Sequence, residues 1–228
     1  MSEQTTQQQH PTTQRLSAMV ETFERETSAE LLIATCPQSG HYYASAWATG
    51  TVLGMIALMM YIFSPIEYYD DLGVYSVIGS FALGYFLVAL LPAMQRLLTR
   101  KNTQTYFVDM RAHATFVKEG IHHTKSETGV LVFISLLEQQ AVVIADRGVR
   151  QAMPAADLAA FKKAVSEIFA SGDYLDNLQK VIAQYTPAFA AALPKGDDDT
   201  DELKNALHLT SSQRLMQGGL GLRMFKVR

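Results

Sequence analysis

The stretch TGVLVFISLLEQQAVVIADRG, from Thr128 to Gly148, decides the fold of this chain. Two short apolar runs, Val130–Leu136 and Ala141–Ala145, flank the polar break at residues 138–140. Both runs are rich in Val and Ile, which favour a pleated, buried surface. A break this short predicts an antiparallel hairpin of two strands.

The second run ends in Asp146, Arg147 and Gly148, where a strand is expected to meet a loop, and sites on open α/β sheets often lie at such positions. Asp146 could bind a divalent cation or act as an acid or base, and the guanidinium of Arg147 could grip a phosphoryl group. Gly148 would let the backbone approach a ligand. The alternative is that Asp146 and Arg147 form a local ion pair and that Gly148 makes a turn.

Composition limits the classes of protein to be considered. The chain has 228 residues and a formal net charge of −3, so it has no general basic surface and we expect no nucleic-acid partner. Cys36 is its one cysteine, which excludes an internal disulfide and a thiolate metal cluster. We expect Cys36 to be a small buried side chain.

Two long segments, residues 42–66 and 72–95, contain no charged residue. About 20 helical residues span a bilayer core, so each segment is long enough to cross a membrane. We therefore predict a hairpin of two transmembrane helices at 42–66 and 72–95, the second continuing past Pro92, with the lipid bilayer as a partner. The alternative is a pair of buried core helices in a globular protein.

Small residues recur at intervals of four in both segments: Ala46, Gly50 and Gly54 in the first, Ser80 and Gly84 in the second. This spacing allows close contact between helices. The contact could be between the two helices or with a neighbouring membrane protein, and the pattern leaves both open.

The distribution of basic residues predicts the orientation. The charged residues in the loop between the segments are all acidic. Basic residues lie outside the hairpin, at Arg25, Arg96, Arg100 and Lys101. The positive-inside rule then places both termini in the cytoplasm, as for a two-pass protein of a bacterial inner membrane. Neither segment contains an acidic residue, a basic residue or a histidine, which argues against conduction or transport.

The remaining segments predict a split α/β domain. Residues 1–13 resemble a disordered tail, residues 14–27 a helix, and Glu30–Cys36 a buried strand. This strand is expected to pair in parallel with Val130–Leu136, with the hairpin inserted in the crossover. Residues 14–40 and 100–193 would then form one small mixed sheet flanked by helices, with Glu30 and Asp146 at the same sheet edge, and residues 194–228 an acidic linker and tail.

The chain resembles the TPM domain family. The resemblance lies in ETSAELLIAT (26–35), HHTKSETGVLVFISLLEQQAVVIADRGV (122–149) and FASGDYLDNL (169–178). It extends from about residue 14 to residue 194 and points to the branch of bacterial membrane proteins in which two transmembrane helices interrupt the domain after its first strand. The fold it implies is a small sheet with helices on both faces.

The resemblance also implies candidate site residues. Glu30 and Asp173 are the acids that match family positions beside Asp146, and together they would bind Ca²⁺ or Mg²⁺. A relative in the thylakoid lumen is described as an acid phosphatase, while other relatives resemble accessory proteins of photosystem or receptor complexes. Asp173 also follows Gly172, where it is expected to cap a helix.

Motifs of known phosphatase mechanisms are missing from the predicted domain. The sixth residue after Cys36 is Tyr42, so no cysteine loop ends in arginine, and Asp-x-Asp occurs only in the linker. We therefore expect an accessory or assembly module of a membrane protein complex. A cation-assisted phosphatase-like hydrolase, with Asp146 and Arg147 as catalytic residues, is the alternative, and a ligand or metal sensor without turnover is a third.

Overall fold

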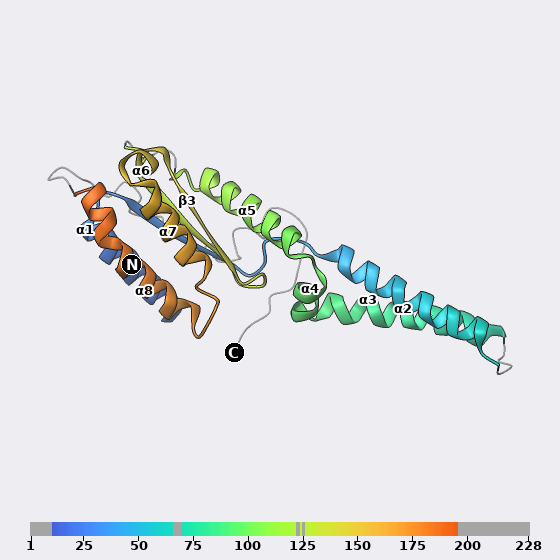
Figure 1. Cartoon of the computed structure of the whole chain (residues 1–228). Coiled ribbons are helices and arrows are strands. Elements are labelled where there is room, and N and C mark those ends of the chain that lie inside the picture. Colours follow the sequence, from blue (N-terminus) through green and yellow to red (C-terminus); the bar gives the residue numbers. More distant parts are fainter. Residues whose placement is uncertain (1–10, 66–69, 122–123, 125, 196–228) are drawn as a thin grey trace, which may run out of the picture. The chain divides into compact units, whose positions relative to one another are not determined.

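The computed structural model describes residues 11–65, 70–121, 124 and 126–195 (Figure 1). In these residues the chain forms eight helices and one three-stranded sheet. It divides into two compact units, an α/β unit from residues 1–37 and 108–228 and a helical unit from residues 38–107.

The sheet of the α/β unit has the order β1-β2-β3 and is mixed, as predicted. Strand β1 (Glu30–Cys36) pairs in parallel with β2 (Gly129–Ser135), although 92 residues separate them in the sequence. Strand β3 (Gln140–Ala145) pairs with β2 in an antiparallel hairpin. Every residue of the central strand β2 is buried, because a strand between two neighbours with helices on both faces has no exposed side.

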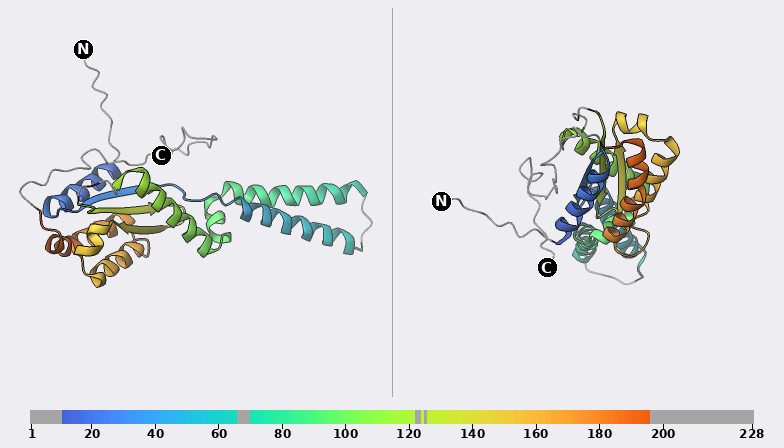
Figure 2. Two further views of the ribbon diagram at one scale, coloured as in Figure 1. Left: turned by 90° about the horizontal axis from the view of Figure 1, so that it is seen from above. Right: turned by 90° about the vertical axis from the view of Figure 1, so that its left-hand side faces the viewer.

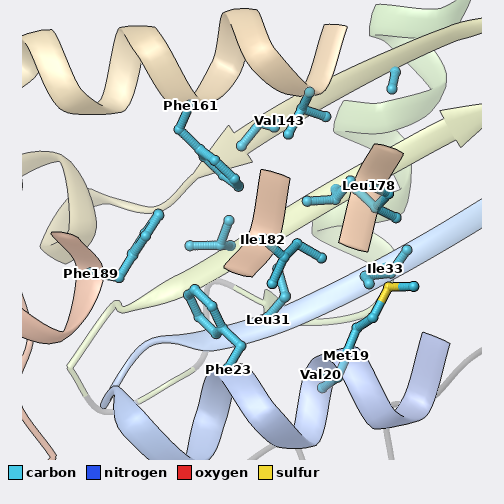
Figure 3. Packing of buried hydrophobic residues seen from close by; sticks show 14 of the residues in the cluster. Met19, Val20, Phe23, Leu31, Ile33, Val143, Phe161, Leu178, Ile182 and Phe189 are labelled. Carbon is cyan, nitrogen blue, oxygen red and sulfur yellow. The ribbon is translucent and has the colours of Figure 1, made fainter. Parts of the chain in front are cut away.

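One face of the sheet carries the main hydrophobic core (Figure 3). It is covered by α1 (Pro11–Glu26), α7 (Ala155–Ser166) and α8 (Tyr174–Ala192). Aromatic rings connect these helices: Phe189 packs edge-on against both Phe23 and Phe161, with ring centroids 5.1 and 5.2 Å away. Such pairs join the three helices into one layer over the strands.

The opposite face of the sheet has a smaller core. Leu32, Leu131 and Phe133 pack there against Val108 and Ala112 of α5 (Lys101–Lys118). Helices on both faces agree with the predicted fold class, a small mixed sheet flanked by helices.

The helical unit is built on a hairpin of α2 (Tyr43–Phe63) and α3 (Asp70–Leu90), which lie side by side (Figure 2). Both are long and apolar enough to cross a membrane by length and composition. The small residues on α2 (Ala46, Gly50 and Gly54) are its buried residues. A Cβ atom added to Gly50 would lie 2.9 Å from the carbonyl oxygen of Phe81, so the small residues serve the contact between the two helices.

Three predicted boundaries were wrong. Residues 11–13, assigned to the disordered tail, belong to α1; residues 1–10 and 196–228 lie outside the described part. The second apolar helix does not continue through Pro92 but ends at Leu90, since Leu91 is extended (φ −106°, ψ 103°). A residue before proline is sterically disfavoured in the helical region, and Pro92 begins a new helix, α4 (Pro92–Leu98).

The third error concerns the end of β3. Asp146 is followed not by a loop but by a short helix, α6 (Arg147–Ala152), with Asp146 as its N-cap. Six residues with one buried apolar side chain, Val149, are too few to produce a helical hydrophobic pattern.

Candidate functional site

The predicted sheet edge holds Glu30 and Asp146 in one row across the three strands. Glu30 is paired with Gly129 on β2, and the backbone N–H of Asp146 donates to the Gly129 carbonyl at 2.9 Å. Two strand spacings separate the two acids, about 10 Å between their backbones. Glu30 lies two residues before Leu32 on one strand, and Asp146 lies two residues after Ile144 on the other. Because side chains alternate between the two faces of a sheet, both acids lie on the face of Leu32 and Ile144, which carries the smaller core.

The carboxylate of Asp146 is partly committed to its own helix. Its Oδ1 accepts a hydrogen bond from the backbone N–H of Arg147 at 2.7 Å, and the residue caps α6. Its Oδ2 is buried and has no hydrogen-bond partner in the described structure. A buried carboxylate oxygen without a donor is unfavourable, and a cation or an ordered water would relieve it. The side chain of Arg147 is exposed at the surface.

Gly148 has a structural reason to be glycine. Its N–H donates to the carbonyl of Glu127 at 2.9 Å. A Cβ atom at Gly148 would lie 2.3 Å from the carbonyl oxygen of Ser126 and 2.8 Å from that of Glu127. The close approach that was expected to serve a ligand is therefore made to the chain itself.

The space between the two acids is filled by an apolar side chain. A Cβ atom at Gly129 would lie 2.3 Å from Cγ2 of Ile121 and 2.9 Å from its carbonyl oxygen. Ile121 is fully buried and covers Gly129 in the middle of the row. Hence any cation that bound to both Glu30 and Asp146 would have to lie beside Ile121.

Asp173, the third predicted acid, lies far from this edge. It begins α8, whose C-terminal end adjoins the start of β1: the N–H of Ser28 donates to Leu193 at 3.0 Å, and Thr27 forms a bridge with Pro194. The 19 residues of α8 separate the two ends by about 28 Å. The structure therefore brings Glu30 and Asp146 to one edge and separates Asp173 from both.

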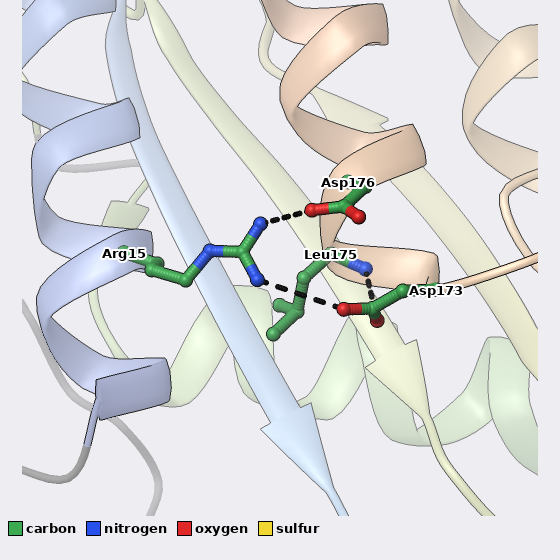
Figure 4. Close-up of polar contacts among 4 residues, drawn as sticks. All are labelled: Arg15, Asp173, Leu175 and Asp176. Carbon is green, nitrogen blue, oxygen red and sulfur yellow. Dashed lines mark hydrogen bonds and ion pairs between the residues drawn. The ribbon is translucent and has the colours of Figure 1, made fainter.

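Asp173 instead joins two helices (Figure 4). Its Oδ1 accepts from the N–H of Leu175 at 3.0 Å, so the predicted helix cap is confirmed. Its Oδ2 lies 3.5 Å from Nη1 of Arg15, and Nη2 of the same guanidinium donates to Asp176. The hydrogen bond with Asp176 and the charges of both aspartates raise the pKa of Arg15. These contacts connect α1 to the first turn of α8.

A third polar cluster, which sequence reasoning missed, lies at the opposite end of the sheet. Ser135, at the end of β2, donates a hydrogen bond to Glu138, and the sulfur of Cys36 lies 3.4 Å from the Ser135 hydroxyl. All three residues are at most 3% exposed. Burial of Cys36 is confirmed, but Glu138 was assigned to a polar turn. The only sequence signal for this cluster was the predicted parallel pairing of the two strands, whose register sets Cys36 beside Ser135.

The chemical capacity of the edge is therefore limited. In the described residues, no group of three or more His, Cys, Asp or Glu side chains is placed to hold a metal ion. The edge offers one orphaned carboxylate oxygen, on Asp146, and a second carboxylate, on Glu30. Carboxylate oxygens suit Ca²⁺ or Mg²⁺, so these residues could contribute to such a site but do not complete it.

The described residues thus define a class: a mixed α/β sheet domain interrupted, after its first strand, by a hairpin of two long apolar helices. No family model and no curated protein matches the sequence. A solved structure to which this chain is similar is the NMR structure of BA42 protein from the psychrophilic bacterium Bizionia argentinensis sp. nov.. It is 16% identical, the match covers 83% of this chain and 88% of that chain, and the TM-score is 0.48.

Proposed function

We propose that this chain is a two-pass protein of a bacterial inner membrane, with a TPM-like α/β domain that serves as an accessory or assembly module of a membrane protein complex. The observation that carries the proposal is the surface of the hairpin. Only 17% of each candidate span is buried, whereas a core helix of a soluble protein is mostly buried. Large apolar side chains such as Met60 and Phe63 are 70% and 78% exposed, which suits lipid rather than water.

The proposed orientation has both termini in the cytoplasm. It rests on the basic residues on the side of Arg25 and Arg96 and on the acidic loop at the other end of the hairpin. A periplasmic alkaline phosphatase fused after Arg228 should remain inactive, and a cytoplasmic fluorescent protein fused there should fluoresce. An active phosphatase fusion would reverse the orientation.

The accessory role is supported by the short connection to the hairpin. β1 ends at Cys36 and α2 begins at Tyr43, so residues 37–42 are the only link on that side. Six residues span at most about 20 Å, which would keep the domain beside the bilayer and its neighbours. Membrane-bound or membrane-proximal proteins are therefore the partners within reach.

Native gel migration tests the accessory role. Membranes holding the tagged full-length protein are solubilised in a mild detergent, and the band is analysed by mass spectrometry. Co-migration with a larger complex in fixed stoichiometry, with the same partners recovered when one of them carries the tag, would support the proposal. Migration as a monomer or as a dimer of this chain alone would count against it.

A second candidate function is a phosphatase-like hydrolase assisted by Ca²⁺ or Mg²⁺, and the orphaned Oδ2 of Asp146 favours it. Asp146 and Glu30 would contribute to cation binding, and Arg147 would contact the phosphoryl group. The substitution Asp146→Asn should then abolish metal-dependent release of phosphate from a general phosphomonoester. Activity that is unchanged in Asp146→Asn would exclude this edge as the site.

A further inference from the structure

The short helix α4, which follows the hairpin, is a separate structural element and not a frayed end of α3. It is bounded by extended residues on both sides, Leu91 and Thr99. The side-chain amide of Gln95 donates to the carbonyl of Ala89 at 3.0 Å, near the end of α3. This bond satisfies a carbonyl that the helix break leaves without its normal partner, so the corner between α3 and α4 is stabilised.

The corner after α4 is fixed in the same way. Gln104, on α5, is 3% exposed, and its side-chain amide donates to the carbonyls of Arg96 and Thr99 at 2.6 and 2.9 Å. The backbone N–H of Thr99 also donates to Gln95 at 3.1 Å. Two glutamine side chains thus hold α4 in a defined direction within the helical unit.

The surface of α4 combines exposed leucines with basic charge. Leu97 is 78% exposed and Leu98 is 47% exposed, and α4 has no buried residue. Arg96, Arg100 and Lys101 are also exposed, and the sequence contains no acidic residue between Asp71 and Asp109. An apolar surface bordered by positive charge is typical of helices that lie in the interface of an anionic membrane.

The position of α4 in the chain matches this role. The candidate span Asp71–Leu90 has 20 residues, about 30 Å of helix, which equals the thickness of a hydrocarbon core. If α3 crosses the membrane, its end at Leu90 reaches the headgroup layer, and α4 begins there. A break at Leu91 and Pro92 lets the chain change direction at that level.

We propose that α4, together with Arg100 and Lys101, is a membrane-surface element that binds anionic phospholipid. Leu97 and Leu98 would enter the upper acyl region, while Arg96, Arg100 and Lys101 would contact phosphate groups of the headgroups. This inference rests on the proposed membrane hairpin and goes beyond it, because a spanning hairpin requires no specific lipid at its end.

The test uses full-length protein reconstituted into vesicles of phosphatidylcholine and phosphatidylglycerol. In a Cys36→Ala background, one cysteine is introduced by Leu97→Cys, Ile56→Cys or Lys162→Cys and labelled with a fluorophore. Ile56 lies in the middle of α2, and Lys162 lies on the exposed surface of α7. Quenching by nitroxide lipids labelled at shallow or deep positions gives the depth of each label.

We expect deep quenching at position 56 and shallow quenching at position 97; the label at position 162 reports the quenching of a site in the α/β unit for comparison. If the label at position 56 is quenched deeply and the label at position 97 is not quenched, the inference is overturned while the membrane hairpin is supported. Quenching at 97 as deep as at 56 would also overturn it. Absence of quenching at position 56 would refute the membrane hairpin itself, and the lipid site with it.

The lipid preference is tested at position 97 with shallow nitroxides on phosphatidylglycerol or phosphatidylcholine. Quenching should favour phosphatidylglycerol, and the preference should fall severalfold when Arg96, Arg100 and Lys101 are all changed to Gln. The matched control, Lys162→Gln with Lys163→Gln, removes charge from α7 and should leave the preference unchanged. Equal quenching by the two lipids, or a preference that survives the triple change, would contradict anionic lipid binding.

Discussion

Gly50 and Gly84 bring the backbones of α2 and α3 into direct contact: a Cβ atom added to Gly84 would lie only 3.1 Å from the Cα atom of Gly50. The same atom would lie 3.1 Å from the carbonyl oxygen of Thr49. The spacing of small residues allowed a contact either between the two helices or with a neighbouring membrane protein, and the structure shows the first. The hairpin uses them for its own packing, so they are not available as the contact surface for a neighbouring protein.

The first prediction concerns this contact. Gly84→Ala should separate the two helices and destabilise the hairpin by about 1–3 kcal/mol, because the backbone must move to accept the methyl group. Trp47, the only tryptophan, reports on the packing, since its ring lies 5.6 Å from Phe81 and 5.4 Å from Tyr85. The emission maximum of Trp47 should shift, and the midpoint temperature of unfolding that this fluorescence reports in detergent should fall.

Gly79→Ala is the matched control, because a Cβ atom there meets no heavy atom within 4 Å. It should leave the Trp47 spectrum and transition unchanged. Equal shifts in Gly79→Ala and Gly84→Ala would contradict the glycine contact.

The second prediction concerns Gly148. Gly148→Ala should destabilise the α/β unit by roughly 1–3 kcal/mol or more, since two backbone carbonyls, of Ser126 and Glu127, block the added methyl group. Gly172→Ala serves as a comparison: there is open space around it, and only its positive φ of 67° opposes the change, which costs about 1–2 kcal/mol. Circular dichroism melting of the full-length protein measures both. A smaller loss for Gly148→Ala than for Gly172→Ala would argue against the close approach.

The third prediction separates the two roles of Asp173. Asp173→Ala should destabilise α8 by about 1 kcal/mol, because the bond to the Leu175 N–H is lost. Asp173→Asn keeps a capping oxygen and loses only the charge toward Arg15, a pair that is exposed and weakened by salt. It should therefore be nearly neutral in the same melting experiment. Equal losses in the two variants would show that the ion pair, and not the cap, holds the helix.

The fourth prediction concerns alkaline pH. Burial raises the pKa of Tyr174, and the neighbouring charge of Asp173 adds to the rise. The folded state holds the proton of the Tyr174 hydroxyl more tightly than the unfolded state does. The contribution of Tyr174 to stability is therefore fully present below about pH 10 and is lost as pH rises through the folded pKa. Tyr174→Phe keeps the stacking on Phe169, at 5.3 Å, and should reduce the loss of stability above pH 10. If Tyr174→Phe loses as much stability above pH 10 as the unsubstituted protein, the contribution of Tyr174 is refuted.

Much of the fold could be predicted because strong local patterns pointed to it. The apolar runs at Glu30–Cys36 and Val130–Leu136 defined strands, and the need of β1 for a partner led to the parallel pairing. That pairing in turn placed Glu30 and Asp146 at one edge. The helix break at Leu91 was missed although the following proline signals it, because an unbroken apolar sequence dominated the interpretation.

The candidate site could be predicted only in part, since it depends on tertiary distances. Nothing in the sequence shows that α8 carries Asp173 away from the edge, or that Ile121 covers Gly129 between the two acids. The buried contact of Ser135 with Glu138 depends likewise on how the turn after β2 folds back. Each is a consequence of packing between segments distant in sequence, which local periodicity does not encode.

The proposed crossing of a bilayer by α2 and α3 is tested by extraction of membranes at alkaline pH. Carbonate treatment opens vesicles and releases proteins held only by surface contacts, whereas helices in the hydrocarbon core remain. We predict that the full-length protein stays in the membrane pellet after carbonate and enters the supernatant only with detergent. Release by carbonate alone would contradict the membrane hairpin.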